Sequence, residues 1–233
     1  MSAPSGPSLQ ALSQKPATSA AIFLHGYGSN GDDLIGLAPA FAQHLPSTAF
    51  YSPQGPEPWE GGMFGGRQWF TLAGYDPEAM RRDPLRMGGV YEKMFQGAVK
   101  SSGFLHEFID DVARHHNLSG AKIALIGFSQ GTMMALHTGL RRAEALAGIV
   151  GFSGAMVGGT QLKDQIKSRP PVVLIHGSAD PVVPVEALSE IKKTLDENAV
   201  PVEILVIPGH QHGIDQIGAE RAITFLRHKL SAA

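Results

Sequence analysis

The pentapeptide GFSQG at residues 127–131 fits the pattern G-x-S-x-G and places Ser129 at its centre. A β-branched apolar run at residues 123–126 predicts a buried strand before it, and apolar residues at near-helical spacing after it predict a helix. A tight turn between strand and helix lifts the serine Oγ clear of the sheet, as a nucleophile requires. Flanking glycines leave room for the crowded backbone. The helix N-terminus would offer free N–H groups to a developing oxyanion.

A glycine-rich loop follows an earlier predicted strand. The apolar run at residues 20–24 leads directly into HGYGSNG at residues 25–31. Such a loop lets backbone N–H groups approach a ligand closely, and in acyl-transfer enzymes that ligand is the substrate carbonyl oxygen. An ordinary turn between strand and helix is the alternative. Asp32 and Asp33 then favour the start of a helix whose apolar face runs from Leu34 to Leu45.

Two later strands end in residues that could work with a serine. The strand predicted at residues 171–175 leads into HGSADPVVP, where Asp180 is well placed to orient a histidine. A simple Asx turn is the alternative for this aspartate. The last predicted strand, residues 202–207, leads into PGHQHGI. This segment supplies His212 as a base and His210, two residues earlier, as its rival.

The loop from Pro56 to Leu72 is aromatic and holds both tryptophans of the chain. Because loops lie at the surface and often carry function, we expect this loop to form a wall of the substrate site. Its substrate-binding side chains would be Trp59, Phe64, Trp69 and Phe70. A flap packed on the core, or a contact in a homodimer, is the alternative.

Composition excludes several classes of function. The chain has no cysteine, which excludes disulfides, thiolate catalysis and Cys-ligated metal. Its formal net charge of −2 gives no electrostatic case for a nucleic-acid partner. The histidines are scattered, and we expect the adjacent His115 and His116 to be solvated, so we expect no metal. No secretion signal and no transmembrane segment are visible, so we expect a cytoplasmic protein.

The alternation of strands and helices predicts an α/β fold with a mostly parallel central sheet and helices on both faces. We interpret residues 1–233 as one domain, with residues 1–18 as a loose lead-in that contributes an edge strand near Leu9–Leu12. Residues 76–90 would cross the surface, and a helix would run from Val90 to Asn117.

Ser153 lies in a second, incomplete copy of the serine pattern. The sequence GFSGA at residues 151–155 lacks the final glycine of G-x-S-x-G. The next residues, MVGGT, predict no helix. We therefore interpret Ser153 as a structural or site-lining residue and not as a nucleophile.

Ser129, Asp180 and His212 occur in the chain order of the α/β-hydrolase triad, each after a predicted strand. With LHGYGSNGDDL at residues 24–34, GFSQG, HGSADPVVP and HGI at 212–214, the chain from residue 20 to residue 230 resembles the phospholipase/carboxylesterase family of α/β-hydrolases, a compact group that includes acyl-protein thioesterases. The resemblance implies Ser129 as nucleophile, Asp180 as orienting acid and His212 as base. It also implies an oxyanion hole made by the N–H groups of Tyr27 and Gln130, and no cofactor. Thr132 departs from the family, where many relatives have a second glycine.

We therefore expect a serine hydrolase that cleaves a small-molecule or lipid ester or thioester through an acyl-enzyme. Carboxylesterase, lysophospholipase and thioesterase activities all belong to this class. The alternatives are a main role as acyl-protein thioesterase, a non-catalytic binding module on the same fold, or an acyltransferase or peptidase that uses the same triad. Fold and triad do not fix the acyl acceptor or the chain length.

Overall fold

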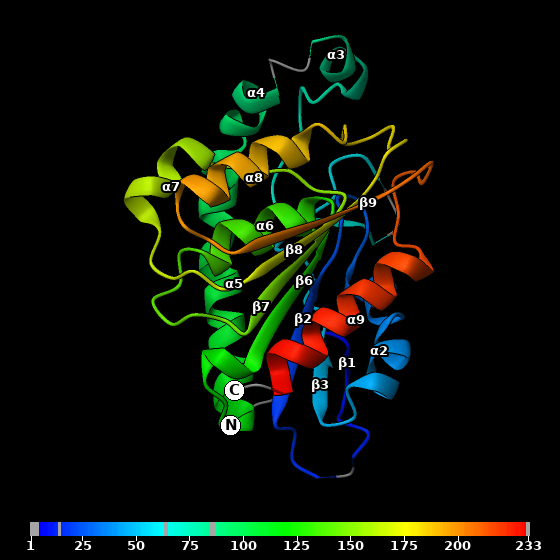
Figure 1. Cartoon of the computed structure of the whole chain (residues 1–233), viewed down its shortest axis with the longest axis vertical. Helices are drawn as coiled ribbons and strands as arrows, with labels where there is room; N and C mark the ends of the chain where they lie inside the picture. Colours follow the sequence, from blue (N-terminus) through cyan, green and yellow to red (C-terminus); the bar gives the residue numbers. More distant parts are fainter. Residues whose placement is uncertain (1–4, 14, 63–64, 84–86, 232–233) are drawn as a thin grey trace.

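A computed structural model describes residues 5–13, 15–62, 65–83 and 87–231. Within these residues the main sheet has seven strands in the order β1-β3-β2-β6-β7-β8-β9 (Figure 1). Neighbouring strands are parallel, except that β1 runs antiparallel to β3. The strands are β1 (Ser8–Leu9), β2 (Ser19–Leu24), β3 (Thr48–Tyr51), β6 (Ile123–Phe128), β7 (Gly148–Phe152), β8 (Val172–Gly177) and β9 (Val202–Ile207).

The central strands form from continuous apolar runs because both of their faces are covered. Every residue of β2, β7 and β8 is buried. A strand in such a sheet has no solvent side, so its sequence shows no alternation of polar and apolar residues. The edge strand β9 is only partly buried. The predicted α/β fold with a mostly parallel sheet is confirmed.

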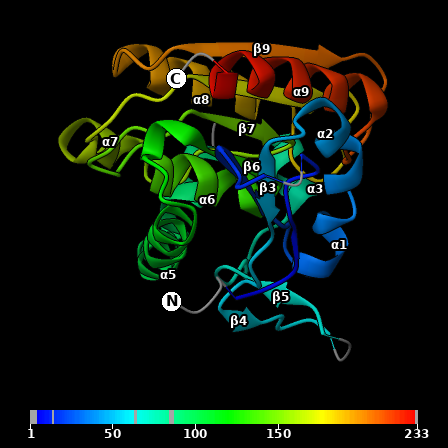
Figure 2. The same cartoon turned by 90° about the horizontal axis from the view of Figure 1, so that it is seen from below.

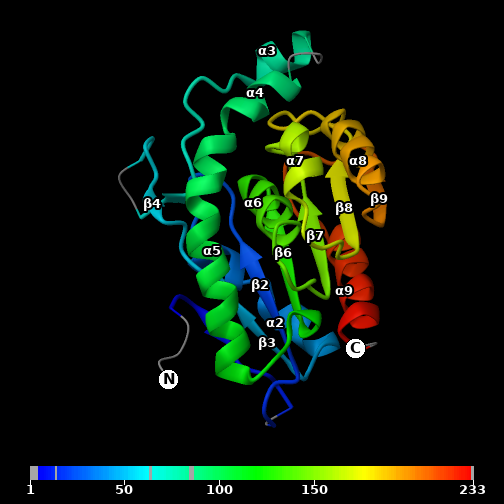
Figure 3. The ribbon, with the colours of Figure 1, turned by 90° about the vertical axis from the view of Figure 1, so that its left-hand side faces the viewer.

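Helices cover both faces of the sheet (Figures 2 and 3). Each face has its own hydrophobic core. Alternate residues of β2 divide between the two cores: Ile22 and Leu24 pack on the side of α5 and α6, whereas Phe23 packs on the side of α2 and α9. The described helices are α1 (Gly31–Ile35), α2 (Ala38–His44), α3 (Pro77–Arg82), α4 (Met87–Lys93), α5 (Phe95–His116), α6 (Gln130–Gly139), α7 (Gly159–Gln165), α8 (Ala187–Glu197) and α9 (Gln216–Ser231). None of these is long and apolar enough to cross a membrane.

The helix predicted after Asp32 and Asp33 is in fact two helices. Asn30 caps α1 by accepting a hydrogen bond from the Asp33 N–H, and α1 ends at Ile35. Pro39 occupies the first turn of α2. Proline has no N–H to donate and its ring clashes with the carbonyl four residues earlier, so it begins a new helix and does not continue the old one.

Other local predictions also need correction. Residues 76–90 contain α3 and the first half of α4, and the Asp76 carboxylate caps α3 through the N–H groups of Glu78 and Ala79. The segment predicted to form no helix after Ser153 runs into α7, which begins at Gly159. His116 is not simply solvated, because its Nε2 lies 2.6 Å from the Tyr51 hydroxyl.

The parallel strands bring several loops to one edge of the sheet. The loops after β2, β6, β8 and β9 all leave from the carboxyl ends of their strands and meet there (Figure 1). The long loop after β3 contains a small antiparallel pair, β4 (Glu57–Pro58) and β5 (Arg67–Gln68). The fold thus places Ser129, Asp180 and His212 at this edge, where sheets of this type form their sites.

Candidate active site

Ser129 occupies a sharp turn between β6 and α6. Its φ of 54° and ψ of −115° lie in a region that residues with a side chain rarely adopt. Its N–H donates to the Phe152 carbonyl at 2.9 Å, which ties the turn to the neighbouring strand. A Cβ at Gly127 would overlap the backbone of Gly131, and a Cβ at Gly131 would overlap the Leu24 carbonyl. Both glycines are therefore required for the helix to leave the strand so abruptly.

Asp180 and His212 meet where β8 and β9 end. His212 Nδ1 lies 2.7 Å from Asp180 Oδ2. Asp180 Oδ1 accepts hydrogen bonds from the N–H groups of Val182 and Val183 at 2.8 and 2.9 Å, so this residue forms an Asx turn and holds the histidine as well. Because a carboxylate only accepts, Nδ1 carries the hydrogen, and neutral His212 presents Nε2 as a proton acceptor.

His176, at the end of β8, supports the same carboxylate. Its Nε2 lies 2.9 Å from the Val183 carbonyl oxygen and 3.4 Å from Asp180 Oδ2. Burial raises the pKa of Asp180, but hydrogen bonds from His176 and His212 outweigh burial and hold that pKa well below its usual range. Asp180 is therefore charged at neutral pH. The sequence alone gives His176 no role, because nothing in its local pattern shows that it faces Asp180.

Ser129 and His212 line one cavity of about 500 Å³. The ring of Phe128 packs against the His212 ring, with centroids 4.8 Å apart, and fixes the histidine beside the turn. Ser129 is 9% exposed. The structure thus brings Ser129 to the cavity that the Asp180–His212 pair also reaches.

Two backbone N–H groups near Ser129 have no protein acceptor within the described part of the chain, those of Tyr27 and Gln130. Two of the neighbouring amides do have acceptors: Gly28 donates to the Arg67 carbonyl, and Ser129 donates to the Phe152 carbonyl. The φ of 79° at Gly28 is a left-handed conformation that favours glycine, and it turns the loop at this point. Free amides beside a nucleophile are what oxyanion stabilisation needs, which supports the prediction for these two residues.

His25 fixes the loop that carries Tyr27. The imidazole is fully buried, and its Nε2 accepts a hydrogen bond from the Gly55 N–H at 2.8 Å. Its Nδ1 therefore carries the hydrogen and donates to the Gly26 carbonyl at 2.8 Å. Burial, foremost, lowers the pKa of His25 and keeps it neutral. His25 is a scaffold for this loop and does not line the described cavity.

The side chain of Gln130 fastens the aromatic loop to the serine turn. Its Oε1 accepts from the Trp69 N–H at 2.9 Å, and its Nε2 donates to the Phe70 carbonyl at 2.7 Å. Because these residues are 60 positions or more apart in sequence, no local pattern predicts the contacts. Gln130 therefore joins two regions of the site by its side chain, besides its predicted backbone role.

Of the four aromatic residues predicted to bind substrate, the three that the structure describes do not line the cavity. Trp69 and Phe70 are 0% and 2% exposed and belong to the core on the α5 side of the sheet. Trp59 packs edge-on against Tyr27, with ring centroids 6.0 Å apart, and does not line the described cavity. Phe64 lies outside the described residues. For Trp69 and Phe70 the structure favours the alternative interpretation, a loop packed on the core.

Other side chains line the cavity. Its apolar walls include Leu72, Ala73, Tyr75, Pro77 and Val182. Tyr27 and Glu60 also line it, and the tyrosine hydroxyl donates to the glutamate at 2.5 Å. Burial, and then the hydrogen bond to Glu60, raises the pKa of Tyr27 to about 12. The tyrosine therefore stays neutral at the site.

His210 and Ser153, the alternatives to His212 and Ser129, lie away from the cavity at Ser129. Within the described residues, His210 makes no hydrogen bond to Asp180, and its Nε2 is buried without a partner. Ser153 is 1% exposed, and its Oγ is likewise buried and unpaired in the described chain. Neither residue lines the cavity at Ser129.

A serine at a strained strand-to-helix turn, with an Asp–His pair at the same cavity, on a mostly parallel sheet, is the arrangement of the α/β-hydrolases. The chain belongs to the phospholipase/carboxylesterase family, which it matches over residues 10–230. It is accordingly a hydrolase of esters or thioesters.

Individual relatives agree with this assignment. The crystal structure of esterase PE8 is 37% identical, superimposes with a TM-score of 0.86, and matches over 97% of this chain and 99% of that one. Esterase YpfH of Escherichia coli (strain K12) is 26% identical over 93% of this chain and 85% of the relative. Acyl-protein thioesterase 1 of Saccharomyces cerevisiae (strain ATCC 204508 / S288c) is 28% identical over 94% of this chain and 96% of the relative.

Proposed function

We propose that this protein is a serine hydrolase of carboxylic esters that works through an acyl-enzyme, with Ser129, Asp180 and His212 as its triad. The observation that carries the proposal is the 2.7 Å contact between Asp180 and His212, in a pair that reaches the cavity of Ser129. A binding module would have no need of a strained serine beside an oriented base.

The chemistry follows from the roles of these groups. His212 Nε2 takes the proton of the Ser129 hydroxyl as Oγ attacks the carbonyl carbon. The N–H groups of Tyr27 and Gln130 receive the oxyanion, and each such donor contributes about 3–4 kcal/mol to lowering the barrier. His212 then gives its proton to the departing alcohol or thiol. In the second half, a water attacks the acyl-enzyme with His212 as base, which releases the acid and restores Ser129.

A main role as acyl-protein thioesterase is the second candidate. It is favoured by the several relatives that carry this name, including the one from Saccharomyces cerevisiae. The same triad cleaves either bond, because both reactions pass through a tetrahedral oxyanion. Only the group that leaves differs, so the choice rests on what the cavity mouth accepts.

The test combines labelling with a substrate panel. Wild-type protein is treated with a fluorophosphonate probe, and the modified peptide is mapped. Untreated protein is assayed in parallel on a p-nitrophenyl ester, an acylated peptide thioester, a lysophospholipid and an anilide.

We expect the label on Ser129, turnover of the ester and the thioester, and little turnover of the anilide. A label on Ser153, or ester turnover that survives without any label on Ser129, would overturn the proposal. Faster cleavage of an acylated peptide thioester than of simple esters would favour the second candidate. Preferential anilide cleavage would point to a peptidase.

A further inference from the structure

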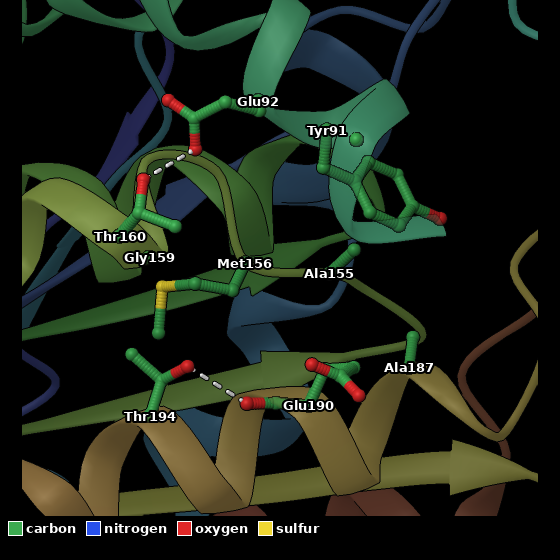
Figure 4. Close-up of a pocket in the computed structure, with 10 residues that line it drawn as sticks. Tyr91, Glu92, Ala155, Met156, Gly159, Thr160, Ala187, Glu190 and Thr194 are labelled. Carbon is green, nitrogen blue, oxygen red and sulfur yellow. Dashed lines mark hydrogen bonds between the residues drawn. The ribbon is translucent and has the colours of Figure 1, made fainter. Parts of the chain in front are cut away.

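A second cavity, of about 240 Å³, lies between α4, α7 and α8 (Figure 4). It shares none of its described lining residues with the cavity at Ser129. Its walls include Tyr91 of α4, Ala155 and Met156 after β7, and Ala187, Glu190 and Thr194 of α8. Nothing in the proposed mechanism uses this space.

The walls of this cavity offer apolar surface to a ligand. Ala155, Met156 and Ala187 are buried, and the two alanines leave room that larger side chains would fill. The threonine hydroxyls are already engaged: Thr194 Oγ1 donates to the Glu190 carbonyl at 2.9 Å, and Thr160 Oγ1 to a Glu92 carboxylate oxygen at 3.0 Å (Figure 4). Because these polar groups have partners, an alkyl group fits this cavity better than a polar ligand does.

Two tyrosines separate the second cavity from the catalytic one. Tyr91 lines the second cavity, and Tyr75 lines the cavity of Ser129. Their rings lie 6.1 Å apart, and their hydroxyl oxygens are 3.5 Å apart, at the outer limit of a hydrogen bond. Tyr75 is held on the catalytic side by donating to the Val182 carbonyl at 2.5 Å. Burial, foremost, raises the pKa of Tyr91, so its hydroxyl is uncharged.

We propose that the second cavity is the distal part of the acyl site and that Tyr91 determines how long an acyl chain the enzyme accepts. This rests on the proposed function. A short acyl chain ends in the catalytic cavity, on the near side of Tyr75. A longer chain parts the weakly bonded tyrosines and places its terminal methylenes against Ala155, Met156 and Ala187. Glu190 at the exposed rim disfavours chains that end in a carboxylate, so the site takes uncharged alkyl ends.

The test measures kcat/KM for p-nitrophenyl esters from acetate to dodecanoate. Tyr91→Ala should raise the ratio of decanoate to butyrate by roughly tenfold, since each newly buried methylene adds up to about fourfold. Ala187→Phe fills the cavity and should lower the same ratio by a similar factor. Acetate turnover should stay within a fewfold in both variants.

Matched controls separate this effect from general damage. Tyr91→Phe keeps the ring and should leave the ratio near the wild-type value. Val90→Phe fills a different cavity of about 210 Å³, which also touches Tyr75, and should leave the ratio unchanged. The double variant Tyr91→Ala/Ala187→Phe should lose the increase in the decanoate-to-butyrate ratio that Tyr91→Ala alone produces. Melting temperatures identify any variant that is merely unfolded.

The outcomes distinguish this inference from the proposed function. Equal losses at every chain length in both Tyr91→Ala and Ala187→Phe would overturn the acyl extension while leaving the triad in place, provided that acetate turnover still depends on Ser129. The same ratio change in Val90→Phe would also overturn it. Absence of Ser129-dependent hydrolysis in the wild type would overturn both proposals.

Discussion

Two serines, Ser129 and Ser153, follow strands of the sheet with nearly the same sequence around them, but in the described structure only Ser129 lines a cavity together with His212. Ser129 follows β6 and Ser153 follows the adjacent β7. Both have positive φ values, 54° and 47°. Both donate their N–H at 2.9 Å to a carbonyl of the next strand in the sheet, Phe152 of β7 and Ile175 of β8 respectively.

The chain takes a different course after each of the two serines. After Ser129 the helix α6 begins at once, at Gln130. After Ser153 the chain runs on through buried residues, and α7 begins only at Gly159. The Ser129 side chain therefore faces a cavity, whereas the Ser153 hydroxyl is enclosed. Backbone strain at a strand end does not by itself make a nucleophile; the turn must also expose the hydroxyl beside a base.

The largest expected effect comes from removing each serine hydroxyl in turn. Ser129→Ala should lower kcat on a p-nitrophenyl ester by at least about 10⁴-fold, because the acyl-enzyme can no longer form. Ser153→Ala should keep kcat within about twofold, because its Oγ has no partner among the described residues. Steady-state kinetics and melting temperatures of both variants decide the point. Comparable losses of kcat in the two variants would contradict the assignment of Ser129 alone as the nucleophile.

The next effect tests whether Asp180 orients His212 toward Ser129. Asp180→Asn should lower kcat by about 10³–10⁴-fold, because an amide nitrogen facing His212 Nδ1 would favour the wrong tautomer. KM should change little. The exposed Asp196→Asn on α8 is the matched control and should behave as wild type. A loss of less than about tenfold in Asp180→Asn would show that another residue orients His212.

Local sequence patterns predict the strands and the turn at Ser129, but they cannot predict contacts between residues that are far apart in the chain. Buried strands appear as apolar runs, and the turn at Ser129 is visible because its glycines and its helix are local. The roles of His176 and the Gln130 side chain depend on contacts with the chain far away, so no local pattern reveals them. The burial of Trp69 could not be predicted either, because an aromatic loop that packs on the core has the same composition as one that lines a site. No local pattern predicts the positive φ of Ser153 either, since glycine is the residue usually expected there.

A smaller effect concerns the residue after Ser153. Gly154 occupies this position, and a Cβ there would overlap the Thr132 side chain in the first turn of α6. Gly154→Ala should therefore destabilise the protein by about 1–3 kcal/mol through overpacking. Gly103→Ala on α5 has nothing within 4 Å of the new Cβ and should be neutral or slightly stabilising.

A second substitution identifies the overlapping partner. Thr132→Gly removes the side chain that the new methyl would meet, so the double variant Gly154→Ala/Thr132→Gly should be less destabilised than the sum of its single changes. Urea unfolding measures all the free energies. Strict additivity would mean that the two turns are not packed against each other at this point.

An effect of similar size is a pH dependence of stability that arises from a buried histidine on α6, the helix that follows Ser129. His137 lies on α6, and its buried ring packs against the Phe95 ring, with centroids 5.6 Å apart. Burial, followed by the charge of Arg141, lowers the pKa of His137 to about 3. In the unfolded chain the pKa returns to about 6.5. Between these values the unfolded state binds the extra proton, so the stability contribution of the neutral ring is complete above about pH 6.5 and is lost as the pH falls toward about 3.

At about pH 5 this loss should amount to about 2 kcal/mol, from roughly 1.5 pH units at about 1.36 kcal/mol each. His137→Gln cannot be protonated, so its free energy of unfolding should fall by that much less between about pH 7 and about pH 5. The carboxylates titrate alike in both proteins, and the difference therefore isolates this one ring. The exposed His228→Gln serves as the control and should show the wild-type slope. If His137→Gln also keeps that slope, the pKa of His137 is the same in the folded and the unfolded protein, and burial does not hold this ring neutral at about pH 5.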